Sequence, residues 1–418
     1  MSVRITTLPS GLRVVTDHIP HVESAAVGVW VDVGARHEAA EVNGVAHMLE
    51  HMAFKGTAKR DARRIAEEIE AVGGSLNAYT SRENTAYYAR VLKADVPLAV
   101  DILSDILQHS TFDETELDRE RAVIIQEIGQ SFDTPEDLIF DQFQEVLYPD
   151  QPLGRPILGT EELIKSIPRA DIASYMKRNY MASGMVLAAA GNVDHAALVA
   201  QAESAFAEIG TGVPPTAAPA RYAGGERFEN RDLEQVHFTL GFDGVPYGDP
   251  DYYAASVFSY LLGGGMSSRL FQEIREKRGL VYSIYSFTSP YRDGGNFGVY
   301  AGTGEKEVDE LVPVLSDELN KVASKITAEE LARTKAQMKA GMLMSLESTS
   351  SRCERLAQNM LIHGRVHSYQ EIIDKIDAVD EAAVGRVAQR MMRSKPTVAA
   401  LGPVGRLERM APISARFS

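Results

Sequence analysis

The first half of the chain alternates between strand and helix patterns of apolar residues. Residues 27–33 alternate with a period of two and predict a strand, and residues 76–92 are rich in β-branched and aromatic residues and predict a hairpin. Residues 94–109 carry apolar side chains at helical spacing, and helices are also expected over 41–54 and 115–130. This succession of strands and helices predicts the α+β fold class.

The second half of the chain repeats this pattern after a linker. Residues 210–225 contain three prolines and almost no charge, which is typical of a linker. Beyond it, Leu-Ser-Asp at 315–317 matches the same tripeptide at 103–105, and each lies 15 residues after a tyrosine. We therefore predict two homologous α/β units, each a mostly antiparallel sheet packed with helices, related by duplication. The predicted bounds are 1–212 for the first unit, 213–226 for the linker and 227–418 for the second unit.

The two predicted copies differ in their polar residues. Aligning Leu117 with Leu331 places Glu120 opposite a threonine and Glu127 opposite a glycine. No histidine occurs between His237 and His363, so the second copy has no counterpart of the segment HMLEH at 47–51. Packing requirements would apply to both copies, so polar residues confined to one of them indicate function.

Composition and charge narrow the classes of function. The 418 residues carry a formal net charge of −15, which argues against non-specific binding to nucleic acid or to an anionic membrane. The single cysteine, Cys353, excludes an intramolecular disulfide framework. The N-terminal residues lack the apolar core of a secretory signal, and no apolar run approaches membrane-span length. We expect a soluble intracellular protein.

The segment HMLEH has the spacing of a metal site. Positions i and i+4 share a helical face, so His47 and His51 can present both imidazoles to one ion, with Glu50 beside them. The order H-x-x-E-H is the inverse of a common zinc motif. The same letters also fit a partly exposed polar helix face, and a zinc site needs a third ligand. Glu120 and Glu127 lie seven residues apart and share a helical face, so one could bind the metal while the other orients a histidine.

Several motifs together resemble a known family. HMLEHMAFKGT at 47–57, GGSLNAYTSRENTAYY at 73–88 and LGRPILG at 153–159, with Glu127 76 residues beyond His51, resemble the pitrilysin-type zinc peptidases. Within them the chain resembles the catalytic β-type subunit of mitochondrial processing peptidase and its bacterial relatives. The resemblance spans essentially the whole chain and implies a zinc-dependent endopeptidase, with its zinc site in the first unit.

The resemblance assigns roles to individual residues. It implies zinc ligation by His47, His51 and Glu127 and a general base at Glu50, whereas Glu120 matches the acidic residue seven positions before the third ligand. In the second unit, a pair seven residues apart matches the family's arginine and tyrosine, which reach the substrate carbonyl and the developing oxyanion. That pair is Arg275 and Tyr282. The alternative is that these two residues have no role in catalysis and are simply a surface arginine and a tyrosine of a strand.

The resemblance also implies substrate contacts. Phe54 matches an aromatic wall of the pocket for the side chain after the cut, although it equally fits a core position. Asn77 and Ala78 match the edge strand to which an extended peptide adds. Asp137 and Asp141 match acidic positions that hold an arginine two residues before the cut; they could instead form a solvated acidic face.

Peptides or unfolded polypeptides are the expected substrates. The alternatives are a non-catalytic scaffold or partner subunit, as in respiratory-complex core proteins of the family, and a peptide-binding module without turnover. The chain has two units where larger single-chain relatives have four, so we expect a homodimer, with a heterodimer containing an inactive partner as the alternative. The lack of a presequence favours a bacterial cytoplasmic protein.

Overall fold

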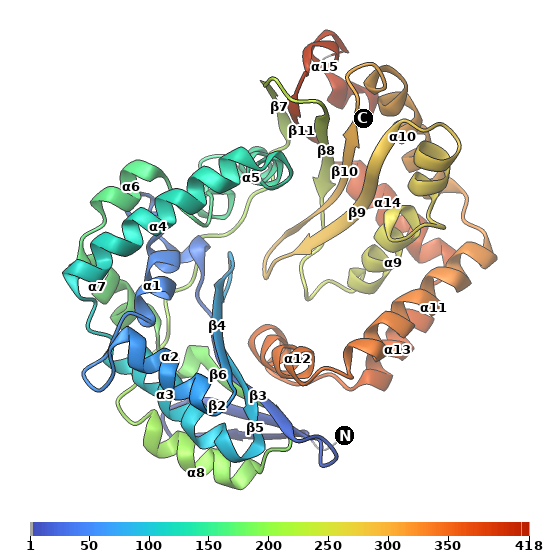
Figure 1. The fold of residues 1–418 in the computed structure, drawn as a ribbon. Helices are drawn as coiled ribbons and strands as arrows, with labels where there is room; N and C mark the ends of the chain where they lie inside the picture. Colours follow the sequence, from blue (N-terminus) through green and yellow to red (C-terminus); the bar gives the residue numbers. More distant parts are fainter. Residues whose placement is uncertain (1–2, 411, 418) are drawn as a thin grey trace. The chain divides into compact units, whose positions relative to one another are not determined.

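The computed structural model describes residues 3–410 and 412–417 and divides into two compact units (Figure 1). Neither unit is contiguous in sequence. The first unit comprises the chain up to Gly129, Arg155–Ala218 and Met344–His367. The second unit comprises Gln130–Gly154, Pro219–Leu343 and the chain from Ser368 onward. Each unit is described by itself below.

The first unit contains a six-stranded sheet in the order β1-β2-β6-β3-β5-β4. β2 and β6 are parallel and all other neighbours are antiparallel. The predicted hairpin is confirmed as β4 and β5, and the predicted strand at 27–33 runs from Ser24 to Val31 as β3. The strand bounds are β1 Val3–Thr7, β2 Arg13–His18, β3 Ser24–Val31, β4 Ser75–Thr80, β5 Thr85–Leu92 and β6 Met185–Gly191.

Helices pack on one face of this sheet around a core of Val, Leu, Ile and Met side chains. The predicted helix at 94–109 is confirmed as α3, which contacts β3 and β5, and α8 contacts β2. Two further predicted helices are confirmed as α1 and α4. The bounds are α1 Val45–Ala53, α2 Ala62–Ala71, α3 Val96–His109, α4 Glu114–Asp133, α6 Glu161–Ser166, α7 Arg169–Asn179 and α8 His195–Ala205, with short 3-10 turns at Ala35–His37, Ala40–Val42, Lys93–Asp95 and Ala182–Gly184.

The second unit repeats this topology in five strands. Its sheet order is β7-β11-β8-β10-β9, with β7 and β11 parallel and the other pairs antiparallel. This is the order of β2-β6-β3-β5-β4, so the predicted duplication and fold class are confirmed. The strand bounds are β7 Gly225–Asn230, β8 Val236–Asp243, β9 Val281–Pro290, β10 Gly295–Thr303 and β11 Thr397–Gly402.

The helices of the second unit follow the same succession. α9 contacts β9, and α10 and α14 complete a second apolar core. α11 is the counterpart of α4, and Thr334 on α11 is buried as Glu120 is on α4, in keeping with the sequence alignment. The bounds are α9 Tyr252–Gly263, the π-helix η6 Phe271–Glu276, α10 Val308–Ser324, α11 Ala328–Ser345, α13 Tyr369–Asp377, α14 Glu381–Met392 and α15 Gly405–Met410, with 3-10 turns at Pro152–Gly154 and Ile413–Arg416.

One helix from each half of the sequence packs in the opposite unit. α12, Thr349–His363, lies in the first unit against β2, β3 and β6. α5, Pro135–Leu147, lies in the second unit against β7, β8 and β11. Every residue of β6 and β11 is buried because these central strands have helices on both faces. The predicted bounds divide the chain into contiguous halves, and this exchange of helices is a feature that the sequence pattern did not indicate.

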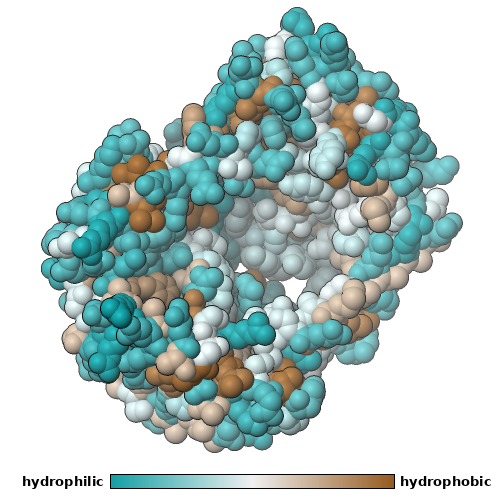
Figure 2. Space-filling view, in the orientation of Figure 1, coloured by the Kyte–Doolittle hydropathy of each residue, from teal (hydrophilic) through white to brown (hydrophobic). Residues whose placement is uncertain are grey.

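The predicted linker has no regular secondary structure over most of its length, and the surface seen in Figure 2 is mainly polar. Residues 211–224 form no helix or strand, whereas Gly225 and Glu226, which we assigned to the linker, begin β7. Among the described residues, no helix combines the length and apolar character needed to cross a membrane. The face shown in Figure 2 is mainly hydrophilic, with hydrophobic residues scattered over it.

Candidate metal centre

The metal-site segment forms helix α1, which buries most of its surface. Six of its nine residues are buried apolar side chains, and the partly exposed residues are His47, Glu50 and His51. Their spacing of three and four residues places these polar groups on one stripe of the helix. The helix begins after Gly44, whose φ of +97° is a left-handed conformation that favours glycine. The apolar pattern therefore fixes which face of α1 the polar groups occupy.

A buried carboxylate holds the start of this helix. Glu38 accepts hydrogen bonds from the backbone N–H groups of Gly44 and Ala46, at 2.9 and 2.7 Å, and from the side-chain amide of Asn43 at 2.7 Å. These donors include N–H groups that lack partners within the first helical turn. Burial raises the pKa of Glu38 to about 7, although the three donors and Arg155 act to lower it. Glu38 thus anchors the helix that carries both histidines.

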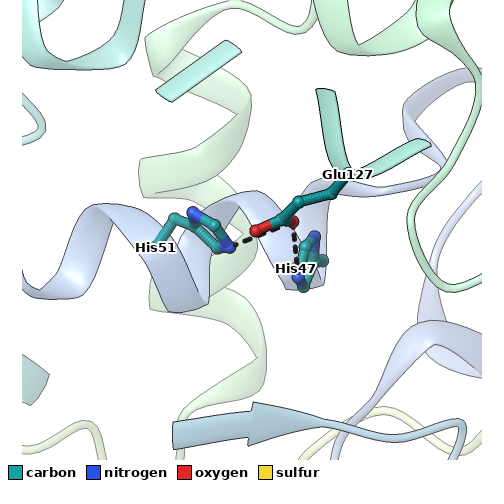
Figure 3. Close-up of side chains that lie close together, drawn as sticks. All are labelled: His47, His51 and Glu127. Carbon is teal, nitrogen blue, oxygen red and sulfur yellow. Dashed lines mark ion pairs between the residues drawn. The ribbon is translucent and has the colours of Figure 1, made fainter. Parts of the chain in front are cut away.

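Three side chains from α1 and α4 converge on one point (Figure 3). Glu127 Oε2 lies 3.8 Å from His47 Nε2 and 3.6 Å from His51 Nε2, and the donor atoms of this group all lie within 4.8 Å of one another. With metal–ligand bonds of about 2.0–2.1 Å, donors in a tetrahedral zinc site lie about 3.3 Å apart. Two imidazoles and one carboxylate are a catalytic-type zinc donor set. The geometry is therefore compatible with zinc.

Burial and neighbouring charges shift the pKa values of the two histidines in opposite directions. Burial, together with a smaller effect of neighbouring His51, lowers the pKa of His47 to about 4, so His47 is neutral near pH 7. Burial also opposes the charged form of His51, but the carboxylates of Glu120, Glu127 and Glu50 outweigh it and raise the pKa of His51. A neutral imidazole offers the lone pair that a metal requires.

Glu120 orients His51 from the side opposite the metal position. Its Oε2 lies 2.8 Å from His51 Nδ1, so Nδ1 donates to the carboxylate and Nε2 is left to face Glu127. Lys55 Nζ lies 2.7 Å from the other oxygen of Glu120. Burial alone would raise the pKa of Glu120, but the contacts with His51 and Lys55 lower it overall. Glu120 therefore stays ionised beside the histidine, as carboxylates that orient metal-bound histidines do.

The Glu120→Gln variant is expected to bind zinc about 10- to 100-fold more weakly than the parent, because its side chain no longer holds His51 with a charged acceptor. Competition with a chromogenic chelator measures this affinity. Glu114→Gln is the matched control, since Glu114 is an exposed carboxylate on the same helix. Equal zinc affinities of Glu120→Gln and Glu114→Gln would contradict this role.

Glu50 is held by a residue of the edge strand. Thr80, the last residue of β4, donates a hydrogen bond of 2.5 Å to Glu50 Oε2. The other oxygen, Oε1, makes no hydrogen bond to any described residue. Burial raises the pKa of Glu50, against the lowering effects of the Thr80 hydrogen bond and of His51. One oxygen is thus held by Thr80, and the other has no hydrogen-bond partner among the described residues.

The remaining residues predicted in the first unit lie around this group. Phe54 caps the end of α1, is partly buried and packs against Tyr87 with 6.2 Å between ring centroids. Asn77 and Ala78 lie on β4, which is the edge strand of the sheet, as predicted. The side-chain oxygen of Asn77 accepts a hydrogen bond from the backbone N–H of Ala78. That N–H therefore has a side-chain partner instead of a neighbouring strand.

Four predicted residues belong to the second unit and are described within it. Arg275 Nε donates to the backbone carbonyl of Tyr282 at 2.9 Å, and Tyr282 is 78% exposed. Asp137 and Asp141 both lie on α5, one helical turn apart. Within the second unit, the structure thus joins Arg275 to Tyr282 by a hydrogen bond and places Asp137 and Asp141 on the same helix.

Two family models match consecutive parts of the chain. The sequence model of "Insulinase (Peptidase family M16)" matches residues 13–161, and that of "Peptidase M16 inactive domain" matches residues 166–338. The chain belongs to peptidase family M16. An uncharacterized zinc protease of Rickettsia felis is 41% identical to this M16 chain over 400 residues, which are 96% of this chain and 97% of the relative. One of Streptomyces coelicolor is 41% identical over 413 residues, 96% of this chain and 90% of the relative.

A solved structure supports the fold of this M16 protein. A protease from Helicobacter pylori superposes with a TM-score of 0.89 at 23% identity, covering 96% of this chain and 99% of the other. Similarity at that identity concerns the fold. The names of the relatives, together with the donor set of His47, His51 and Glu127, identify zinc as the cofactor of this M16 chain.

Three residues of the M16 site were not recognised from the sequence. Lys55 lies within the segment MAFKGT and Thr80 within NAYT, so both stand in the motifs that carried the resemblance. Glu38 lies nine residues before His47, outside those motifs. All three act by hydrogen bonds or ion pairs with residues that are distant along the chain or across a turn. Such contacts leave no periodic signal in a sequence.

Proposed function

We propose that this M16 protein is a zinc-dependent endopeptidase that cuts extended peptides. The proposal is carried by one observation: a His₂Glu donor set has beside it a partly buried carboxylate, Glu50, with one oxygen held by Thr80 and the other without a hydrogen bond to any described residue. Such a carboxylate is placed to exchange protons with a water near the donor set. A structural carboxylate at this position would be expected to have both oxygens engaged.

Bound zinc supplies a water of lowered pKa and polarises the peptide carbonyl. His47, His51 and Glu127 hold the ion, and Glu120 keeps His51 in the tautomer that turns Nε2 toward it. Glu50 accepts the proton of the attacking water at Oε1 and then donates it to the leaving amine. The hydrogen bond from Thr80 to Oε2 keeps the carboxylate in the orientation that this transfer requires.

An extended peptide is the substrate that the open edge of β4 suits. β4 pairs with β5 on one side, and no strand of the described residues pairs with its other side. The N–H of Ala78, now bonded to the side chain of Asn77, can donate instead to a peptide carbonyl. Binding through the main chain tolerates many sequences, and Phe54, partly exposed after α1, lines the pocket for the side chain that follows the cut.

The finer roles implied by the family resemblance complete the proposal. Arg275 and Tyr282 stabilise the oxyanion, and Asp137 and Asp141 favour an arginine two residues before the cut. Two carboxylates one helical turn apart suit a guanidinium, which can accept both as partners. The active species is a homodimer, since one chain carries both the proposed zinc site and the Arg275–Tyr282 pair.

A non-catalytic scaffold is the second candidate. The "inactive domain" description applies to residues 166–338, which lie beyond the candidate ligands and Glu50. The part of the chain that matches the insulinase model contains all of them, from His47 to Glu127. A scaffold has no need of a complete donor set or of Glu50, so the peptidase is favoured.

Metal removal tests the proposed activity. A quenched-fluorescence peptide library should be cleaved by the purified protein and should lose at least about 90% of that cleavage after chelation, because the proposed mechanism relies on zinc to activate the water and to polarise the peptide carbonyl. Stoichiometric Zn²⁺ should restore cleavage, whereas Mg²⁺ should not, since this nitrogen-containing donor set disfavours it. Cleavage that survives chelation, or a purified chain without zinc and without activity after zinc addition, would overturn the proposal.

A further inference from the structure

The edge strand β4 has two faces with different surroundings. Leu76, Ala78 and Thr80 point to the face of α1, where the first two pack on the main core and the third reaches Glu50. Asn77 and Tyr79 point to the opposite face, where Tyr79 packs with the apolar cluster around α12. A peptide added to β4 would likewise direct alternate side chains to the two faces.

The second face is only partly covered. α12 packs chiefly on β2, β3 and β6 in the middle of the sheet. Tyr79 on β4 and Tyr88 on β5 pack against the apolar cluster around α12 but remain partly exposed, with 6.3 Å between their ring centroids. Tyr88 also stacks on the buried ring of Trp30. Two tyrosine faces are thus held in place next to the open edge.

A carboxylate stands at the tip of Tyr79. The Tyr79 hydroxyl donates to Glu354 Oε1 at 3.1 Å, and it accepts from Trp30 Nε1 at 3.1 Å. Gln358, one turn along α12 from Glu354, is a further partner of this hydroxyl at 3.2 Å. Glu354 is exposed, and no cationic side chain among the described residues forms an ion pair with it. Its charge therefore faces the surface beside β4 without compensation.

We propose that Glu354, with the rings of Tyr79 and Tyr88, forms a subsite for an arginine or lysine side chain of a peptide bound along β4. This subsite lies on the face opposite the zinc helix. The inference rests on the proposed function in one respect, that an extended peptide adds to the edge of β4. It concerns a different surface from that of Asp137 and Asp141, which belong to the second unit.

The chemistry selects a long basic side chain. A residue opposite Tyr79 across the new strand pair lies beside it on the same face of the sheet. The methylene stem of arginine or lysine can lie along the Tyr79 ring, which brings the charged head to the carboxylate at the ring's tip. A shorter or acidic side chain would fail to reach Glu354 or would be repelled by it.

An arginine scan tests the subsite. Binding of fluorescent alanine-based peptides, each with one arginine at a successive position, is measured by anisotropy with the zinc-loaded Glu50→Gln variant, which keeps the peptide intact. Arginine should strengthen binding most at one position of the peptide. It should strengthen binding more weakly two residues away, where the side chain points to the same face, and have little effect at the positions between. Adding Glu354→Gln should weaken binding of the best peptide about fivefold, as for a partly exposed charge pair, while the all-alanine peptide is unaffected.

Glu354→Gln retains an acceptor for the Tyr79 hydroxyl, so the fold is preserved. Glu347→Gln, which removes an exposed charge seven residues earlier, is the matched control and should leave the arginine preference intact. An arginine preference unchanged by Glu354→Gln, or lost equally in Glu347→Gln, would overturn the subsite. The Asp137→Asn/Asp141→Asn double variant should spare this preference. Anisotropy requires no turnover, so absence of cleavage in the parent protein would sink the proposed activity and leave this test valid.

Discussion

Replacing Glu50 by glutamine is expected to lower kcat/KM for peptide cleavage about 10²- to 10⁴-fold, the usual contribution of a general acid–base. The variant loses the oxygen charge that accepts the proton of water, while the side-chain volume and an acceptor for Thr80 are retained. His47, His51 and Glu127 are unchanged, so zinc content should remain at one ion per chain. Activity with a fluorogenic peptide and metal analysis of the same sample measure both quantities.

The control for this experiment is Glu70→Gln, which removes an exposed carboxylate of α2. Its kcat/KM should match the parent value. The result that contradicts the role of Glu50 is cleavage by Glu50→Gln within a factor of about five of the parent. Loss of zinc together with activity would point instead to a structural effect on α1, and urea unfolding of both variants distinguishes that case.

Separating the two halves of the sequence is expected to abolish folding of each. A fragment of residues 1–212 lacks α12, whose buried Leu356, Met360 and Leu361 cover the second face of the first sheet. A fragment of residues 227–418 lacks α5, whose Ile139, Phe143 and Leu147 cover β11. Truncating one large core residue costs about 2–5 kcal/mol, so loss of three such residues with their helix is comparable to the ~5–15 kcal/mol that stabilises a typical domain.

Co-expression provides the matched comparison. The two fragments together contain α12 and nearly all of the first and second units, and they should co-purify as a complex with cooperative thermal unfolding. Either fragment alone should be insoluble or should unfold without a cooperative transition. A full-length chain cut at a protease site inserted between Thr216 and Ala217 should remain folded, because these residues lie outside every helix and strand. A lone fragment that unfolds cooperatively near the parent temperature would contradict the exchange.

Much of the fold could be predicted from local sequence patterns. The hairpin of β4 and β5, the helices α1, α3 and α4, and their repetition after the linker all follow from periodicities within about twenty residues. The metal histidines were predictable for the same reason, because i and i+4 spacing on a helix is a local property. The third ligand was different: Glu127 is 76 residues from His51, and resemblance to a family, not periodicity, singled it out.

The sequence by itself determined the strand and helix pattern, the duplication and the two histidines with Glu50 on one face of α1. Only the tertiary structure decided that Glu120 and Lys55 join His51 in a chain of contacts, that Thr80 holds one oxygen of Glu50, and that α5 and α12 exchange between units. The physical reason is that periodicity reports which face of an element is buried, but not what buries it. An apolar face of α12 is satisfied by any sheet of suitable shape, and only the folded chain selects the sheet that covers it.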